Sequence, residues 1–251
     1  MKRDELVTYL DDYLQINAIQ DSSDNGLQVE GAAEVQRLAF AVDASLAAFE
    51  EAQAAVAQML IVHHGLFWGK ALRVTGNHRR RLKLLLDADI SLYAAHLPLD
   101  SHKTVGNSAA LARRLALDEI VPFGEYQGLS VGYAGLLPQP LSLDDLVVRV
   151  ETLLGKPVVA VWPFGSDTVR RVGIITGGGA SLIDQAAAAG IDAYLTGEMS
   201  HSFYHQAREL EQNVIFAGHY ATETVGLQAL AEHLSDRFGL ETIFLDLPTG
   251  A

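Results

Sequence analysis

Short apolar runs alternate with longer amphipathic segments along most of the chain. The first 20 residues place four apolar side chains on one helical stripe and predict an amphipathic helix: Leu6, Leu10, Tyr13 and Leu14. A polar, turn-rich stretch follows at 21–26. Beyond it, we expect helices at 45–58 and 78–88 between strands at 38–42, 59–63 and 91–95. Strands that alternate with helices in this way indicate a parallel sheet covered on both faces.

The second half of the chain repeats this order of elements. Helices at 181–189 and 201–210 separate strands expected at 171–176, 193–196 and 214–217, and a last helix is expected near 224–237. Residues 37–42 align with residues 170–175 at an offset of 133, and the third strands align at an offset of 123 because one loop is longer. The pattern predicts a duplicated α/β fold with mostly parallel sheets. Its two similar lobes, about 1–125 and 126–251, are expected to share a site at their junction.

Two further elements are expected where the lobes meet in the sequence. A strand or hairpin is predicted at 128–137, and a helix at 143–154 with Ser142 as its N-cap. No stretch of the chain is rich enough in Pro, Gly or Ser to form a flexible linker. The lobes are therefore expected to pack together.

Composition and charge narrow the class of protein. The chain has 251 residues, of which 49% are hydrophobic and 20% charged, and this suits a globular protein with a sizeable core. Its net charge of -13 argues against a nucleic-acid partner. Cysteine is absent, which excludes disulfides, thiolate metal sites and a cysteine nucleophile. The N-terminal residues lack the apolar core of a signal peptide, and no apolar run could span a bilayer. We therefore expect a cytoplasmic protein without a membrane partner.

Histidines gather where the predicted strands end. His63 and His64 end one strand, His96 follows the next, and His219 follows a strand of the second half. Asp100 and Glu223 come four residues after His96 and His219. The carboxyl ends of strands are where open α/β sheets place their ligand sites. A histidine and a carboxylate one helical turn apart can point at one metal ion.

Imidazole and carboxylate groups without a thiolate suit Zn, Mn, Fe, Ni or Co. About three histidines with two carboxylates exceed what one catalytic ion needs and suit two ions. The alternative is a set of strand-end histidines with ordinary hydrogen bonds and of solvated carboxylates. Three such groups at equivalent strand ends of a repeated unit favour a shared metal site.

Two other segments could contribute chemistry. Gly177-Gly178-Gly179 follows a strand and could cradle a phosphate, but it lacks a complete nucleotide-binding motif and is better explained as a tight turn. Glu198 and His201 follow another strand, and either could carry a proton or cap the next helix. The motifs of zincins and serine hydrolases are absent.

Several motifs together resemble one known family. They are Asp24-Asn25-Gly26-Leu27, Ile61-Val62-His63-His64-Gly65, His96-Leu97-Pro98-Leu99-Asp100, Gly197-Glu198-Met199-Ser200-His201 and Gly218-His219-Tyr220-Ala221-Thr222-Glu223, in that order. This order is similar to that of the NIF-three-like family, the dinuclear metal centre proteins also known as GTP cyclohydrolase I type 2 homologues. The resemblance extends from about Leu6 to Phe238, nearly the whole chain.

The resemblance implies a single domain over 1–251, built of two interlinked three-layer α/β/α lobes without the inserted domain of longer members. It also implies a toroidal homohexamer and two divalent ions per chain, held by His63, His64, Asp100, His219 and Glu223. Ring-opening hydrolysis of GTP is assigned to some members, and a metal-handling role is proposed for others.

Two main functions follow as hypotheses. The first is a metal-dependent hydrolase that opens a cyclic C–N bond in a small, nucleotide-like molecule, with Glu198, His201 or His96 moving the proton. The second is a metal-handling or metal-delivery protein without turnover of its own. A third possibility is an interaction module whose metals only brace the junction of the lobes.

Overall fold

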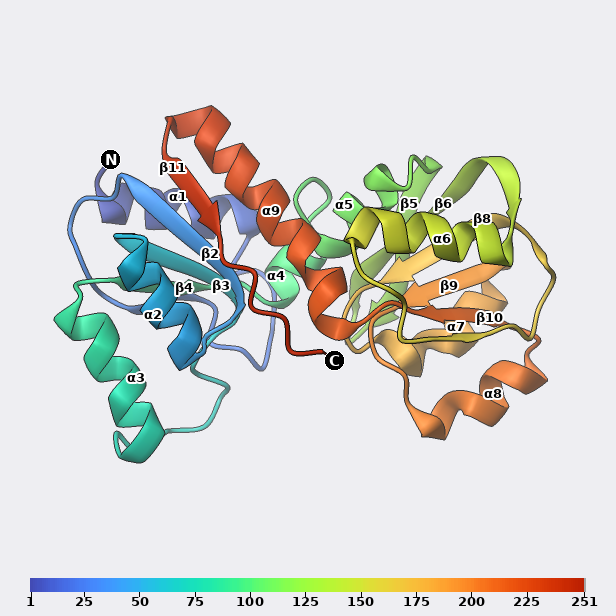
Figure 1. The fold of residues 1–251 in the computed structure, drawn as a ribbon, viewed down its shortest axis with the longest axis horizontal. Helices are drawn as coiled ribbons and strands as arrows, with labels where there is room; N and C mark the ends of the chain where they lie inside the picture. The colour runs from blue at the N-terminus through green and yellow to red at the C-terminus, as the bar shows by residue number, and fades with distance from the viewer. Residues whose placement is uncertain (251) are drawn as a thin grey trace. The chain divides into compact units, whose positions relative to one another are not determined.

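The computed structural model describes residues 1–250, and the chain divides into two compact units (Figure 1). Unit 1 comprises Met1–Val105 and Leu227–Leu247, and unit 2 comprises Gly106–Gly226 with residues 248–250. This division differs from the predicted lobes of about 1–125 and 126–251. The C-terminal strand β11 (Glu241–Phe244) belongs to the sheet of unit 1 because it pairs with β2 (Arg37–Asp43).

The sheet of unit 1 has five strands among the described residues, in the order β1 (Gly26–Val29), β4 (Ser91–Ala94), β3 (Met59–His64), β2 and β11. The pairs β4–β3, β3–β2 and β2–β11 are parallel, whereas β1 runs antiparallel to β4. The predicted mostly parallel sheet is therefore present in this unit. Parallel pairing brings the ends of β3 and β4 to the same edge, where the histidines follow.

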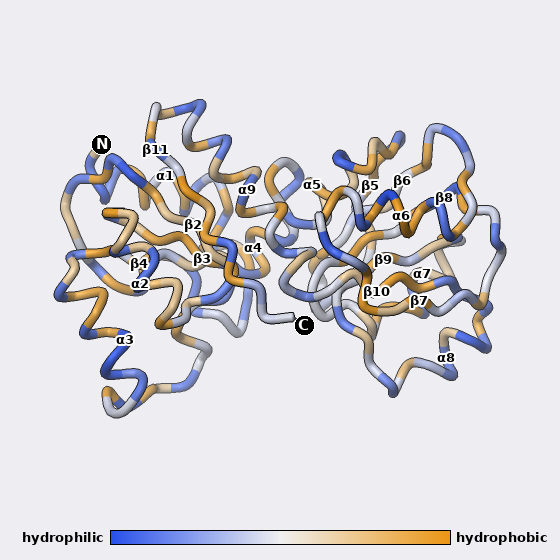
Figure 2. The backbone as a smooth tube through the Cα atoms, in the orientation of Figure 1, coloured by the Kyte–Doolittle hydropathy of each residue, from blue (hydrophilic) through white to orange (hydrophobic). Residues whose placement is uncertain are grey.

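Helices cover both faces of this sheet. Helices α2 (Leu46–Ala54) and α3 (Gly76–Asp87) pack on the face that carries Ala39, Leu60 and Leu92, in a cluster that includes Phe49 and Leu85. Helix α1 (Arg3–Leu14) lies on the other face, where the Tyr93 hydroxyl donates a hydrogen bond to Asp11 Oδ1 at 2.8 Å. Figure 2 shows the apolar character of β2 and β3. These strands are buried on both faces of the sheet, and their sequences are therefore continuous apolar runs.

The sheet of unit 2 has six strands in the described chain, in the order β5 (Asp118–Tyr126), β6 (Leu129–Ser142), β8 (Thr168–Ile175), β9 (Ala193–Thr196), β10 (Asn213–Phe216) and β7 (Ala160–Trp162). Only β8–β9 and β9–β10 are parallel, so this sheet is mixed rather than mostly parallel. A tight turn at Gln127 and Gly128, both with positive φ, joins β5 to β6 as an antiparallel hairpin. The α/β class is confirmed. Of the two alternatives predicted for 128–137, the strand is present, because residues 129–137 lie within β6, the second strand of this hairpin.

Four helices lie wholly in unit 2: α5 (Asn107–Arg114), α6 (Leu143–Leu154), α7 (Ile183–Ala188) and α8 (Tyr204–Glu209). The 3-10 turns η1 (Gly179–Leu182) and η2 (His201–Phe203) precede the last two, and the first residues of α9 (His219–Phe238) also belong to this unit. Helix α6 has the predicted bounds, and Ser142 Oγ accepts a hydrogen bond from the Asp145 amide at 3.1 Å. The strands β2, β3 and β4 in unit 1 correspond in order and direction to β8, β9 and β10 in unit 2. This correspondence agrees with the predicted duplication.

Helix α9 (His219–Phe238) begins five residues before the predicted start near Thr224. His219 is therefore its first residue, and Glu223 lies one turn further along the same helix. Within residues 1–250, no helix combines the length and the apolar character needed to cross a membrane.

Candidate functional site

Three histidines come together at one edge of the sheet of unit 1. His63 and His64 end β3, and His96 lies between β4 and the short helix α4 (Leu97–Asp100). One ring nitrogen of each lies within 4.8 Å of the others. The ring centroids of His63 and His64 are 4.7 Å apart, although a regular strand would direct neighbouring side chains to opposite faces. Both rings therefore reach the same place.

Each of these rings is anchored through Nδ1. His63 Nδ1 lies 2.9 Å from the Ala95 carbonyl oxygen, and His64 Nδ1 lies 2.9 Å from Asp43 Oδ1. His96 Nδ1 lies 3.0 Å from both carboxylate oxygens of Asp21. Because carbonyl and carboxylate oxygens only accept, the proton belongs on Nδ1 and the lone pair on Nε2. Metal-binding histidines are typically held by such an acceptor.

Asp100 meets the buried histidine of this group. It is the last residue of α4, and its Oδ2 lies 3.5 Å from His63 Nε2. His63 is fully buried and Asp100 is 9% exposed. A carboxylate facing the lone-pair nitrogen of a buried imidazole provides two donors for one cation.

The residues that hold His96 were not candidates in the sequence. The buried Asp21 carboxylate also accepts hydrogen bonds from the Leu97 amide and the Asn25 side chain, each at 2.9 Å. Asn25 Oδ1 in turn accepts the His96 amide at 2.8 Å. Burial raises the pKa of Asp21, but the bonds from His96 and Asn25 outweigh it and hold this pKa well below its usual range. The signals in the sequence were the polar turn at 21–26 and the family motif that contains Asn25, and neither pointed to His96.

Unit 2 carries a second group at the start of α9. His219 Nε2 lies 3.0 Å from Glu223 Oε1, and His219 Nδ1 lies 2.7 Å from Glu198 Oε1. Glu223 is 3% exposed. Burial lowers the pKa of His219, but the hydrogen bonds and negative charges of Glu223 and Glu198 outweigh it and raise this pKa to about 9. In the metal-free protein at neutral pH, His219 is therefore a cation between two carboxylates.

The glycine turn after β8 is shaped around Glu223. Gly177 has a φ of +64°, and a Cβ placed on it would overlap Glu223 Oε1 and lie 3.2 Å from His219 Nε2. Its amide donates to Thr222 Oγ1 at 3.0 Å, and the Gly179 amide donates to Thr196 Oγ1 at 3.1 Å. Two amides that could have cradled a phosphate are thus used within the unit, in agreement with the tight-turn interpretation.

Comparison with known proteins places the chain in a family. The family model described as Duf34/NIF3 (NGG1p interacting factor 3) matches residues 1–250. This chain belongs to the DUF34/NIF3 family. A Deinococcus radiodurans protein named GTP cyclohydrolase 1 type 2 homolog is 48% identical over 248 residues, covering 99% of this chain and 94% of that protein. A Pyrococcus abyssi protein of the same name is 45% identical over 250 residues, covering 100% of both.

A solved structure agrees with this assignment. The crystal structure of TTHA1606 from Thermus thermophilus matches with a TM-score of 0.92 and 45% sequence identity, and the match covers 100% of both chains. The family resemblance predicted from the motifs is confirmed, and so is the fold class.

The predicted proton carriers of this DUF34/NIF3 chain differ in their surroundings. His96 lies in the histidine group of unit 1. Glu198 binds His219 Nδ1, which makes it a residue that orients the imidazole. His201 is exposed at the first residue of η2, and no hydrogen bond within residues 1–250 ties it to His219 or Glu198. The catalytic assignments of these three residues stay predictions.

The donor sets fit divalent metal ions of the predicted classes. Unit 1 offers two imidazole Nε2 atoms and unit 2 offers one, in each case beside a buried carboxylate, and an oxygen acceptor holds Nδ1 of each imidazole. Nitrogen and oxygen donors without sulfur suit Zn, Fe, Mn, Ni or Co. The chain therefore contains a group of side chains that could hold a metal ion. The number and identity of the ions stay predictions.

Proposed function

We propose that this DUF34/NIF3 chain binds two divalent metal ions and uses them to hydrolyse a ring C–N bond in a small, nucleotide-like molecule. The observation that carries the proposal is the repeated pairing of an Nδ1-anchored imidazole with a buried carboxylate: His63 with Asp100, and His219 with Glu223. The name shared by the relatives, GTP cyclohydrolase 1 type 2 homolog, supports the reaction class.

In this proposal, His63, His64 and Asp100 hold metal in unit 1, and His219 and Glu223 hold metal in unit 2. Bound divalent ions would supply Lewis acidity and would lower the pKa of water toward neutrality. The acceptors on Nδ1 fix the orientation of each imidazole ring, so that few groups have to be reordered when metal binds. His219 would also have to release the proton on its Nε2.

His96 is the residue best placed to move a proton. Its Nε2 is free to accept one when Nδ1 donates to Asp21, and the buried Asp21 carboxylate would stabilise the imidazolium that forms. Glu198 acts differently, because its oxygen fixes the orientation of His219 rather than facing a substrate. We therefore assign proton transfer to His96 and orientation to Asp21 and Glu198.

The test is an assay of metal-reconstituted protein against GTP and a panel of nucleotides and cyclic amides, with products followed by mass spectrometry. We expect a ring-opened product that carries one added water, formed only by the metal-loaded protein. His96→Gln should lose most of this turnover while it keeps its metal. Asp87→Asn, on the exposed end of α3, should retain the activity. Full metal occupancy without turnover of any compound would contradict the proposal.

A further inference from the structure

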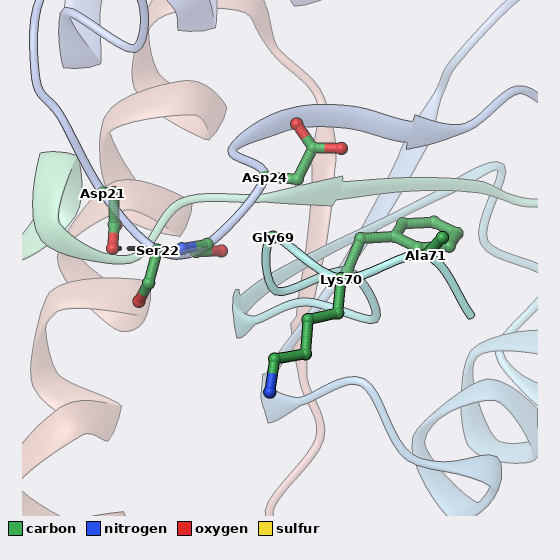
Figure 3. Close-up of a pocket in the computed structure, with 8 residues that line it drawn as sticks. Asp21, Ser22, Asp24, Gly69, Lys70 and Ala71 are labelled. Carbon is green, nitrogen blue, oxygen red and sulfur yellow. Dashed lines mark hydrogen bonds between the residues drawn. The ribbon is translucent and has the colours of Figure 1, made fainter.

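A pocket of about 470 Å³ opens in unit 1 beside the histidine group (Figure 3). Two loops line it, one at residues 21–24 and the other at Phe67 and 69–71. Its volume lies within the range of roughly 300–1,000 Å³ that is typical of small-molecule sites. Of its lining residues, only Asp24 belongs to a motif noted in the sequence, and none was predicted as a site residue.

Ser23 supplies an unsatisfied polar atom in the wall of this pocket. The residue is 6% exposed, and its hydroxyl oxygen has no hydrogen-bond partner within residues 1–250. Leaving a buried hydroxyl unpaired costs free energy, so native proteins rarely do it without a ligand or water partner. The hydroxyl is therefore available to a bound molecule.

The polar groups that line the pocket are one ammonium, two hydroxyls and the carboxylates of Asp21 and Asp24. Figure 3 shows the Lys70 ammonium and the Ser22 hydroxyl extending to the same side, while the Asp24 carboxylate points the other way. The Asp21 carboxylate is already engaged by His96, Asn25 and Leu97. No backbone hydrogen bond within the described chain uses the amides of residues 69–71. A surplus of donors around one cation suits an anion.

Two contacts connect this pocket to the candidate catalytic histidine. Asp21 lines the pocket and holds His96 Nδ1. In the sequence, Trp68 stands between the lining residues Phe67 and Gly69, and its ring centroid is 5.0 Å from that of His96. An anionic group in the pocket would therefore be separated from His96 by the side chain of Asp21.

We propose that this pocket binds a phosphate group of the small-molecule substrate, with Lys70, Ser22 and Ser23 donating to its oxygens. Phosphate is favoured over a carboxylate because an ammonium, two hydroxyls and loop amides offer donors for more than two oxygens. That the phosphate belongs to a substrate rests on the proposed function. The binding of inorganic phosphate to this pocket is independent of that function.

The test measures how fast an acetylating N-hydroxysuccinimide ester modifies Lys70 in the full, metal-free chain, by peptide mass spectrometry. Inorganic phosphate should slow the reaction of Lys70 severalfold relative to chloride at equal ionic strength, whereas Lys2 should react equally in both. Ser23→Ala should raise the phosphate concentration needed for protection by about tenfold, the loss expected for a hydrogen bond to a charged group. Ser130→Ala, an exposed serine on β6, is the matched control.

Three results would overturn the assignment: phosphate that fails to slow Lys70, acetate that slows it as strongly, or Ser23→Ala with an unchanged protection midpoint. Ser23→Ala should fold normally, because the hydroxyl that it removes has no protein partner in the described chain. Phosphate protection of Lys70 without turnover by the metal-loaded protein would count against the hydrolase alone.

Discussion

The orientation of single imidazoles is the property on which metal binding by this protein depends. His64 shows it most simply, because its Nδ1 is bound by Asp43, a residue at the end of the neighbouring strand β2. Removing such an outer acceptor typically weakens metal affinity about 10–100-fold, since the ligand loses its fixed tautomer and orientation.

Asp43→Ala should therefore weaken Zn²⁺ binding by about 10–100-fold, as measured by competition with a chelating dye. Asp87→Ala removes a carboxylate that pairs with the exposed Lys83 on α3, and it should leave the affinity unchanged. Equal affinities in wild type and Asp43→Ala would show that His64 is not a ligand or does not need its acceptor.

The charge state of His219 gives a second prediction at this scale. Its raised pKa of about 9 in the folded, metal-free protein exceeds the ordinary value near 6.5, so its protonation stabilises the fold. This contribution is complete below about pH 6.5 and is lost as the pH rises through about 9. A histidine NMR titration should find this pKa, and Glu198→Gln should lower it. A value near 6.5 in wild type would contradict the geometry described for His219.

Sequence reasoning singled out His63, His64, Asp100, His219 and Glu223 because strand ends and four-residue spacings are local patterns, and their role as metal ligands stays a prediction. It did not locate Asp21 and Asp43 as partners of His96 and His64. Those contacts join residues 75 and 21 positions apart, and only the folded chain brings them together.

Among the elements, the turn between β8 and η1 has the most direct effect on the site. Gly177 leaves room for the Glu223 carboxylate, and its positive φ is a conformation that other residues adopt at a cost. Gly177→Ala should lose metal binding in unit 2 and destabilise the fold. Gly190→Ala is a matched control, because Gly190 has a φ of +66° with open space around a new Cβ.

Gly190→Ala should lower the free energy of unfolding by the backbone strain alone, about 1–2 kcal/mol, and should keep its metal. The measurements are the free energy of unfolding and the metal content of both variants. A Gly177→Ala protein with the same metal content as Gly190→Ala would show that the turn does not shape the site.

Elements with strong local patterns were predictable, and those defined by distant partners were not. The pattern located β9 and α6 with their exact bounds, since apolar runs and the Ser142 cap mark them. The edge strand β11 alternates exposed and half-buried residues and is a strand because it pairs with β2. The start of α9 was placed too late because Gly218, which precedes the helix, offers no side-chain cap, whereas Thr222 is a typical N-cap residue inside its first turn.

At the scale of the whole molecule, the α/β class followed from the repeated alternation of strands and helices. The division into units did not, because it depends on contacts across most of the sequence. The ion pair between Arg37 and Glu241 accompanies the pairing of β2 with β11 and joins residues 204 positions apart. No local pattern indicates that the C-terminal residues return to the first sheet.

The binding of two metal ions by the whole chain is the central claim, and metal stoichiometry after matched reconstitution tests it most directly. Wild type should hold about two ions per chain. Glu223→Ala should fall to about one or fewer, and Glu223→Gln should lose metal nearly as badly because it removes the charge and keeps the shape. Asp144→Ala, in the first turn of α6, should match wild type. Wild-type occupancy in Glu223→Ala would contradict the claim and would leave His219 as an ordinary histidine at the start of a helix.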